Sequence, residues 1–281
     1  MSLKYIQPGS GSGSGTEADP YFFNQLSTAV NAADGESERT LIFTDGSYTT
    51  TSASITITKN ITFKAQNVGK ATIERTGLSA GGTPTYIFCS DTANTSVVLK
   101  FDGLNFRNIY IFFSATPSSI ILDKILLDSS TTLAWSGTYG MVGATGSQAI
   151  TITNSSFAPK FHDGSTKWID AANMTATECS FYLDNSAMTT GSLAYNGTLN
   201  AGTWKNNIFM SEDSARMDAT QDIANITSNC CFHQFGTNNA QGAGSGDGTN
   251  NVFGNPLFID TSTSDLRLRP SSPCINAGTS S

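Results

Sequence analysis

The sequence predicts an all-β protein, a single-stranded right-handed parallel β-helix with a short amino-terminal capping helix. Three observations lead to this prediction. Of the 281 residues, 13% are charged and 38% hydrophobic, and Ser, Thr, Asn and Gly fill much of the remainder. A helical spacing of apolar residues is found in one segment, near the amino terminus. Elsewhere, a six-residue pattern that ends in a large apolar residue recurs, mostly after 21 to 30 residues.

The repeated six-residue pattern indicates stacked coils. It occurs at residues 58–63, 101–106, 122–127, 152–157, 176–181, 203–208 and 227–232. One coil of three short strands cannot bury its own inward-facing apolar side chains. Coils stacked about 4.8 Å apart pair their backbones and build a continuous apolar column. The first step, of 43 residues, is expected to contain a further coil that includes Ala71, Thr72, Ile73 and Glu74.

The first 18 residues are expected to form an arm ahead of the β-helix domain, which we place at residues 19–281. Residues 9–15 read Gly-Ser-Gly-Ser-Gly-Ser-Gly, a composition typical of flexible linkers. We expect this arm to be either flexible or bound to a partner. In the second case, Tyr5, Ile6 and Pro8 are the arm residues that we expect to make the contact.

A capping helix is expected over residues 19–35. Asp19 suits the N-cap, Pro20 suits the first turn, and Gly35 suits the end of the helix. The apolar residues between them lie three and four positions apart and so share one face: Phe22, Phe23, Leu26, Ala29, Val30 and Ala33. Such a helix would cover the end of the apolar column, where strand edges are otherwise exposed.

Strands are expected after this helix. Residues 40–44 and 54–58 alternate and are rich in β-branched side chains, and Asp45-Gly46 suits the turn between strands. A β-sandwich also has many short strands and polar turns, but its hairpins recur every 8 to 12 residues or so. The longer repeat, with Asn-rich turns, favours the parallel β-helix.

Two segments resemble right-handed β-helix proteins of the pectate-lyase-like class. In residues 22–74, a helix, a strand, Asp45-Gly46-Ser47-Tyr48 and Ile55-Thr56-Ile57 follow one another as in the opening of that class. Residues 255–278 begin Asn-Pro-Leu-Phe-Ile-Asp and resemble the closing segment of extracellular and viral β-helix proteins. We therefore place a carboxy-terminal closing segment at residues 250–281. The resemblance implies a fold and no single activity, because this fold carries lyases, hydrolases, adhesins and virion parts.

Composition and charge argue against several partners. The net charge is −7 and Lys and Arg form no run, which argues against nucleic acid. No stretch approaches the roughly 18 apolar residues of a membrane span, so we expect no membrane partner. The amino terminus lacks the apolar core of a signal peptide, and we expect synthesis in a host cytoplasm. We expect no metal and no cofactor, because no ligand spacing or phosphate-binding motif appears.

The five cysteines are expected to be small apolar core residues. They are Cys89, Cys179, Cys230, Cys231 and Cys274. Their number is odd and they show neither a CxxC motif nor a Cys/His metal spacing, so no disulfide framework is expected.

No complete set of catalytic residues is apparent, and the sequence leans towards a protein that is not an enzyme. If it is an enzyme, the best candidates for catalysis are His162, Asp163, Lys167 and Asp170. Lys160 and Trp168 lie beside them, so a base, an acid and an aromatic platform fall within eleven positions. A solvated loop is the expected alternative for this cluster.

A second cluster could place two carboxylates around a sugar, as glycosidases do. It contains Glu212, Asp213, Arg216, Asp218 and Asp222, and an exposed acidic turn is again the expected alternative. His233, Trp135 and Trp204 are expected to be packed residues rather than a base or sugar platforms.

The leading hypothesis is a non-enzymatic structural protein on the outer surface of a bacteriophage virion. It would be a capsid decoration (cement) protein or a tail spike or fibre component. Its expected partners are the major capsid protein or tail proteins, two further copies in a homotrimer, and a surface glycan in a host-attachment role. One alternative is an exported bacterial adhesin. The other is a polysaccharide lyase or glycoside hydrolase, which predicts that carboxylates and a Lys or His from successive coils line up in a groove.

Overall fold

The structure is a computed structural model of the chain. It describes residues 2–32, 36–50, 57, 59–79, 85–87, 97–113, 119–131, 133, 142–144, 149–160, 166–167, 169–170, 173–184, 186, 193–194, 203–212, 227–234 and 250–278.

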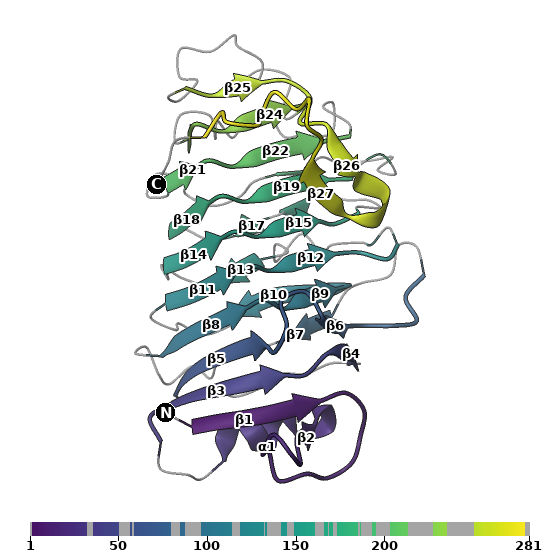
Figure 1. Cartoon of the computed structure of the whole chain (residues 1–281), viewed down its shortest axis with the longest axis vertical. Helices are drawn as coiled ribbons and strands as arrows, with labels where there is room; N and C mark the ends of the chain where they lie inside the picture. Colours follow the sequence, from purple (N-terminus) through teal and green to yellow (C-terminus); the bar gives the residue numbers. More distant parts are fainter. Residues whose placement is uncertain are drawn as a thin grey trace.

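The chain forms a right-handed parallel β-helix with its coils stacked along the long axis of the molecule (Figure 1). Within the described residues, three parallel sheets run along the stack: sheet A with ten strands, sheet B with nine and sheet C with four. Most neighbours in each sheet are corresponding strands of successive coils. The predicted fold class is confirmed.

The strands of sheet A, in spatial order, are β2 (Tyr21–Phe22), β1 (Ser2–Gln7), β3 (Glu38–Phe43), β5 (Asn60–Ala65), β8 (Val98–Asp102), β11 (Ser119–Asp123), β14 (Ala149–Thr153), β18 (Asn173–Thr177), β21 (Thr203–Lys205) and β23 (Thr227–Ser228). Those of sheet B are β4 (Gly46–Thr49), β6 (Ala71–Glu74), β9 (Asn105–Arg107), β12 (Leu126–Asp128), β15 (Ser156–Ala158), β19 (Ser180–Leu183), β22 (Ile208–Ser211), β24 (Cys231–His233) and β25 (Val252–Phe253).

Sheet C contains β7 (Thr85–Ile87), β10 (Ile109–Phe113), β13 (Val142–Ala144) and β17 (Ile169–Asp170). Two short pairs lie outside the three sheets: β16 (Thr166–Lys167) with β20 (Leu193–Ala194), and β26 (Phe258–Asp260) with β27 (Asp265–Leu268).

A sharp corner joins each strand of sheet A to the next strand of sheet B from β8 onwards. The corner residue has a positive φ angle, which Gly and Asn adopt most easily. These residues are Gly103, Lys124, Asn154, Glu178, Asn206 and Asn229, with φ between 51° and 74°. The N–H of Lys124 donates to the carbonyl of Thr153 (3.1 Å), and the N–H of Asn154 donates to that of Thr177 (3.2 Å). The corners therefore hydrogen-bond from one coil to the next.

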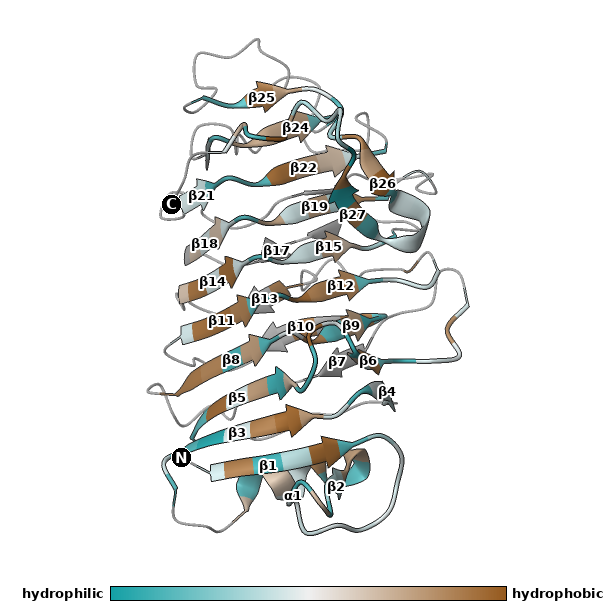
Figure 2. Ribbon diagram, in the orientation of Figure 1, coloured by the Kyte–Doolittle hydropathy of each residue, from teal (hydrophilic) through white to brown (hydrophobic). Residues whose placement is uncertain are grey.

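Hydrophobic residues recur in the strands along the whole stack (Figure 2). The alternate side chains of the strands are buried and form one apolar core. On the sheet B side, Phe157, Phe181, Phe209 and Phe232 stack with ring centroids 5.0 Å apart. This distance is close to the spacing of neighbouring strands, about 4.8 Å. The final apolar residue of the repeated pattern therefore continues its own column from coil to coil.

The pairing of the strands corrects three details of the predicted repeat. Trp204 pairs with Ala176, and Phe209 with Phe181, so the copy expected at residues 203–208 occupies residues 204–209. Phe63 pairs with Phe101, the first residue of the next copy, so residues 58–63 do not form a corner. No extra coil lies within the long first step, because β5 pairs with β8 and β6 pairs with β9.

The helical cap begins later than predicted. It consists of the 3-10 helix η1 (Phe23–Gln25) and the helix α1 (Leu26–Asn31), and the residue at the N-cap of η1 is Phe22 rather than Asp19. Asp19 and Pro20 lie in the preceding loop, because Tyr21 and Phe22 are extended in β2 and pair with β1. Gly35, the predicted end of the helix, lies outside the described residues.

Arg39 attaches this cap to the first coils. Its side chain is buried, with 1% exposed, and its guanidinium donates to the carbonyls of Ala29 (2.9 Å) and Ala32 (2.7 Å). A cation at the carboxyl end of a helix is favourable because the unpaired carbonyls there carry partial negative charge. The cap is therefore held by a polar contact as well as by apolar packing.

The amino-terminal residues do not form the expected arm. Residues Ser2–Gln7 form β1, which pairs with β3 and continues sheet A, and Ile6 is fully buried. The Gly/Ser run is held by its own chain, since the N–H of Gly11 donates to Asn24 and that of Gly13 to Gln25. The glycines permit this close packing because a Cβ atom on Gly11 or Gly13 would overlap neighbouring atoms.

The cysteines differ in part from the expectation. Cys179 and Cys230 are buried free thiols, as expected. Cys231 and Cys274 form a disulfide, so the expectation of none is wrong. The two residues lie 43 positions apart in the sequence, and the fold alone brings them together. Cys89 lies outside the described residues.

Residues 255–278, which we call the strap, fold back over the outer face of sheet B near the carboxy-terminal end of the stack (Figure 1). The strap contains β26, the 3-10 helix η5 (Thr261–Thr263) and β27, and β26 pairs antiparallel with β27. Phe258 and Leu266 of the strap pack against Ala158, Tyr182 and Met210 of sheet B.

Replacing Gly13 with Ala should destabilise the protein, because the added Cβ would overlap the carbonyl oxygen of Pro20. We expect the free energy of unfolding to fall by about 1–3 kcal/mol, as for other overpacked sites. Urea denaturation measures the change, and Ser12→Ala, at an exposed position of the same run, serves as the control. Equal stability of both variants and the wild type would mean that the run behaves as a linker.

Candidate functional site

The outer face of sheet A carries charged and hydroxyl side chains from successive strands. Because strand residues alternate, every second residue of each strand points outwards. The register aligns these residues in a column along the stack, made of Lys64, Asp102, Asp123, Thr153, Thr177 and Lys205. We call this set the outer column.

A hollow of about 370 Å³ lies at the amino-terminal end of this face. Its walls come from four strands or their ends, β1, β3, β5 and β8, and combine apolar, aromatic and charged side chains. The lining residues are Leu3, Tyr5, Thr40, Ile42, Thr62, Lys64, Ala65, Gln66, Lys100 and Asp102. A second hollow, of about 250 Å³, adjoins it and shares Thr40, Thr62 and Lys100. The two hollows form a continuous depression across the sheet.

Two lysines share one carboxylate in the hollow. The Nζ atoms of Lys64 and Lys100 each lie 3.9 Å from Oδ2 of Asp102. Asp102 is mostly covered, with 13% of its side chain exposed, whereas Lys64 and Lys100 are 51% and 37% exposed. Two ammonium groups and one carboxylate leave a net positive charge, so the hollow attracts an anion although the chain as a whole is acidic.

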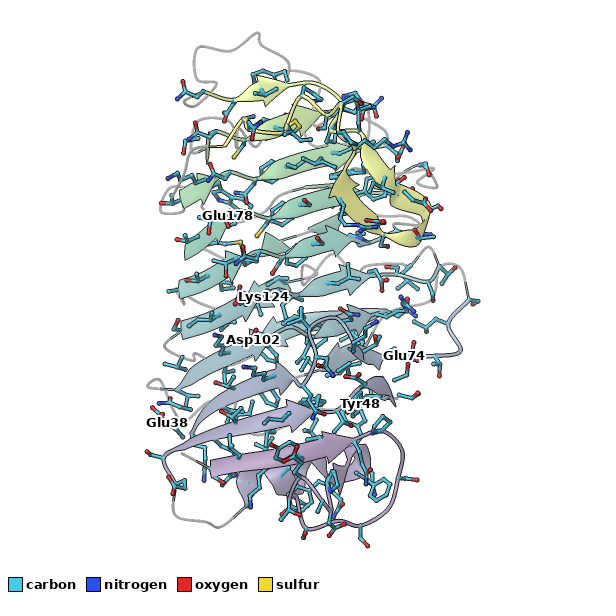
Figure 3. The ribbon with its side chains drawn as sticks, viewed as in Figure 1. Glu38, Tyr48, Glu74, Asp102, Lys124 and Glu178 are labelled. Atoms are coloured by element: carbon cyan, nitrogen blue, oxygen red, sulfur yellow. A yellow bond between two sulfur atoms is a disulfide. The ribbon has the colours of Figure 1, made fainter. Side chains whose placement is uncertain are left out.

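Asp123 extends the charged region to the next coil. Its Oδ1 accepts hydrogen bonds from Thr153 Oγ1 (2.8 Å) and Asn154 Nδ2 (3.0 Å), and its Oδ2 accepts one from Lys124 Nζ (3.2 Å). Burial raises the pKa of Asp123, but the hydrogen bonds from Asn154, Thr153 and Lys124 together hold it below its usual value. Figure 3 shows Asp102, Lys124 and Glu178 following one another up the stack.

This arrangement can bind a carboxylated, polyhydroxylated molecule. Lys64 and Lys100 can donate to a carboxylate, and Asp102 and the threonines can bond hydroxyl groups. The ring of Tyr5 and the side chain of Ile42 offer apolar surface for the C–H groups of a sugar ring. The sheet backbone holds all these groups at fixed spacing, which limits the conformational entropy lost on binding.

The first predicted catalytic cluster is only partly described. His162, Asp163 and Trp168 lie outside the described residues. Lys167 lies in β16, which pairs with β20, whereas Asp170 lies in β17 of sheet C. The structure therefore places the backbones of Lys167 and Asp170 in different sheets, close in sequence but in separate ladders.

Lys160, from the edge of that cluster, forms an isolated parallel bridge with Asp184. In the second cluster, Asp213, Arg216, Asp218 and Asp222 lie outside the described residues. Glu212 is described, and its Oε1 accepts a hydrogen bond from the hydroxyl of Tyr182 (2.6 Å).

The packed residues follow the expectation where they are described. Trp204 is 1% exposed and contacts Phe181 and Phe209, so it is a core residue rather than a sugar platform. His233 is partly buried in β24, and burial lowers its pKa, partly offset by the charge of Glu212. Trp135 lies outside the described residues.

The three residues expected to contact a partner have separate environments. Ile6 is fully buried in the core, which rules out a direct contact with a partner in this fold. Pro8 lies beside Gly46 and Tyr5 lines the hollow. Of the three, Tyr5 is therefore placed to meet a ligand on the outer face of sheet A.

Sequence reasoning missed Lys64, Lys100 and Asp102. A signal was present, because Lys64 and Lys100 alternate with buried Phe63 and Phe101, which predicts that they point outwards. Their mutual contact depends on the register between β5 and β8, and the loop between these strands hides that register from the sequence.

Among the described residues, no group of three or more His, Cys, Asp and Glu side chains is placed to hold a metal ion. None of the described helices is long and apolar enough to cross a membrane.

Comparison with known proteins gives structural similarity only. The sequence matches no protein-family model and no curated protein. Among solved structures, the chain is similar to the pectate lyase Pel9A (14% identity, TM-score 0.39), over 100% of this chain and 92% of that one. It is also similar to the deglycosylated pectin methylesterase from Aspergillus niger (13% identity, TM-score 0.41), over 96% and 91% of the two chains.

The hydrogen bonds of Asp123 predict an acid-dependent loss of stability. Its folded pKa is lowered, so its stabilising contribution is present above the unfolded value, about 3.9, and is lost as pH falls through the folded pKa. Between about pH 5 and 2, the midpoint temperature of unfolding of Asp123→Asn should therefore fall less steeply with decreasing pH than that of the wild type. Glu17→Gln, at an exposed position, serves as the control. Identical slopes for the wild type and Asp123→Asn would contradict this role.

Proposed function

We propose that this chain is a non-enzymatic structural protein of a bacteriophage virion surface, and that the outer face of sheet A binds an acidic glycan. The observation that carries the glycan part is the hollow, which Tyr5 also lines and where the ammonium groups of Lys64 and Lys100 both lie 3.9 Å from Oδ2 of Asp102. Its net positive charge stands out because the whole chain has a net charge of −7.

The chemistry of the hollow favours a carboxylated sugar over a neutral one. A carboxylate can accept from both ammonium groups, and such charge-assisted hydrogen bonds are stronger than neutral ones. Asp102 also lines the hollow, so it offers an acceptor for a sugar hydroxyl. A rigid depression along several coils suits an extended chain of sugar rings.

The virion part of the proposal is supported by the architecture and composition of the chain. The rod is closed by its own cap at one end and braced by the strap near the other. The cap covers the amino-terminal end of the stack, where strand edges would otherwise be free to associate with other chains. The low share of charged residues, 13%, and the acidic balance suit an exposed particle surface. The proposal includes a homotrimer bound to the major capsid protein or to tail proteins, and a host-attachment role for the glycan.

A second candidate function, cleavage of a polysaccharide on the same face, is favoured by one observation. Lys64, Asp102 and Asp123 belong to three successive coils and line up as register partners, as this alternative predicts. A lyase needs a base and a positive charge that stabilises the enolate formed next to a carboxylate. The lysines of the hollow could supply that charge.

Calorimetry with oligogalacturonate, a carboxylated sugar chain, tests the glycan part. Lys64→Gln and Lys100→Gln should each weaken binding about tenfold, the usual loss when one charge-assisted hydrogen bond is removed. Lys70→Gln, at an exposed position outside the hollow, should bind as the wild type does. Equal binding of a neutral maltooligosaccharide, or no binding at all, would overturn the assignment. Release of unsaturated sugars, seen as ultraviolet absorbance, would favour the lyase.

Imaging of purified virions by cryo-electron microscopy tests the virion part. Copies on the capsid lattice would support a decoration protein, and copies at the tail would support a spike or fibre component. We expect one of these two results, with the copies in groups of three. Particles that lack the chain altogether would overturn the virion assignment and leave the glycan measurement unaffected.

A further inference from the structure

The strap is a compact unit with hydrogen bonds of its own. The backbone N–H of Arg269 donates to the carbonyl of Leu257 (2.9 Å), and its guanidinium donates to the carbonyls of Phe258 (3.1 Å) and Ile259 (2.9 Å). Asp260 caps η5 through Ser262, and β26 pairs with β27. These contacts lie within residues 255–278, so they can persist when the strap leaves the stack.

The contacts between the strap and the stack are of two kinds. Phe258 and Leu266 cover Ala158, Tyr182 and Met210, which come from β15, β19 and β22, and Tyr182 also hydrogen-bonds Thr261. The second contact is covalent, since Cys274 is bonded to Cys231 of β24. The strap therefore crosses four successive coils of sheet B, with apolar packing on three and a disulfide on the fourth.

The other described thiols are kept out of exchange with this disulfide. Burial raises the pKa of Cys179 to about 12 and that of Cys230 to about 11, so both stay protonated at neutral pH. Only a thiolate attacks a disulfide. Cys230 is adjacent in sequence to Cys231, yet it points into the core and is fully buried. Among the described cysteines, the redox chemistry is thereby confined to Cys231 and Cys274.

We propose that Cys231 and Cys274 form a redox latch that locks the strap onto sheet B when the protein passes from a reducing to an oxidising environment. In a reducing cytoplasm both thiols stay reduced, and the strap is held by apolar packing and hydrogen bonds alone. Outside, the disulfide forms and limits the separation of the strap from the stack. The latch goes beyond the proposed function and does not depend on the ligand of sheet A.

The locking step is a thiol–disulfide exchange with a low-molecular-weight disulfide such as oxidised glutathione. The thiolate of Cys274, the more exposed of the two, attacks one sulfur of glutathione disulfide and releases one reduced glutathione. The thiolate of Cys231 then attacks the sulfur of Cys274 and releases a second. The two cysteines lose two protons and two electrons, and glutathione disulfide takes up both.

Opening of the latch has a physical consequence for the rod. Tyr182 and Met210 are 4% and 9% exposed beneath the strap, and its departure would uncover them together with Ala158. Contiguous apolar surface of this kind promotes association and local unfolding. A locked strap therefore protects the carboxy-terminal coils in an environment where no cytoplasmic reductant or chaperone is present.

Hydrogen exchange measured by mass spectrometry on the full chain, with and without a phosphine reductant, tests this proposal. Reduction should speed exchange in residues 255–278 about tenfold or more, because a cross-link over 43 residues restricts the open state. Exchange in residues 38–50 and 59–65, at the other end of the stack, should be unchanged and serves as the internal control. Cys274→Ser should exchange as the reduced wild type does, and reductant should have no further effect on it.

Two results would overturn the latch. One is exchange in residues 255–278 that is equal in the oxidised and reduced protein. The other is alkylation of Cys231 and Cys274 in the air-oxidised protein before any reductant is added, which would show that the bond does not form. Both readouts are separate from sugar binding and from particle imaging, so their failure leaves the proposed function intact.

Discussion

The stack depends on hydrogen bonds between each coil and its neighbours. In a parallel β-helix the backbone of a strand is paired only when the next coil lies in register above it. The corners between sheets A and B strengthen this dependence, since Lys124 donates to Thr153 and Asn154 donates to Thr177 in the following coil. A change in the register of one coil would therefore disturb the pairing of the whole rod. The apolar columns, including the Phe stack, have the same spacing and favour the same register.

Because pairing continues from coil to coil, the outermost coil at each end has a neighbour on one side only. Each end of the stack is therefore stabilised by other contacts. At the amino-terminal end, β1 and β2 extend sheet A, the short helix α1 packs into the core, and Arg39 binds the carbonyls at the end of that helix. At the other end, the strap crosses the outside of sheet B and is bonded to it through Cys231 and Cys274. One end is thus covered by packing inside the column and the other is braced from outside.

The same alternation that fills the core also builds the candidate binding face. Phe63 and Phe101 point inwards and stack on one another, so Lys64 and Asp102, their neighbours in the chain, must point outwards and become partners across the strands. The charged groups of the hollow are therefore positioned by the core residues beside them. This coupling explains how a chain without a long charged segment can hold two lysines and a carboxylate at fixed positions.

The sequence by itself determined the fold class, the apolar columns and the corners. These features depend on local chemistry: period-two alternation directs side chains inwards or outwards, and Gly103 and Asn154 suit a positive φ angle. Only the tertiary structure decided which outward residues meet, because coils of unequal length hide the register that joins Lys64 to Asp102. It also decided the pairing of Cys231 with Cys274 and the packing of the Gly/Ser run. By composition alone, that run resembles a linker. Contacts between residues far apart in sequence depend on the path of the whole chain, which no local pattern records.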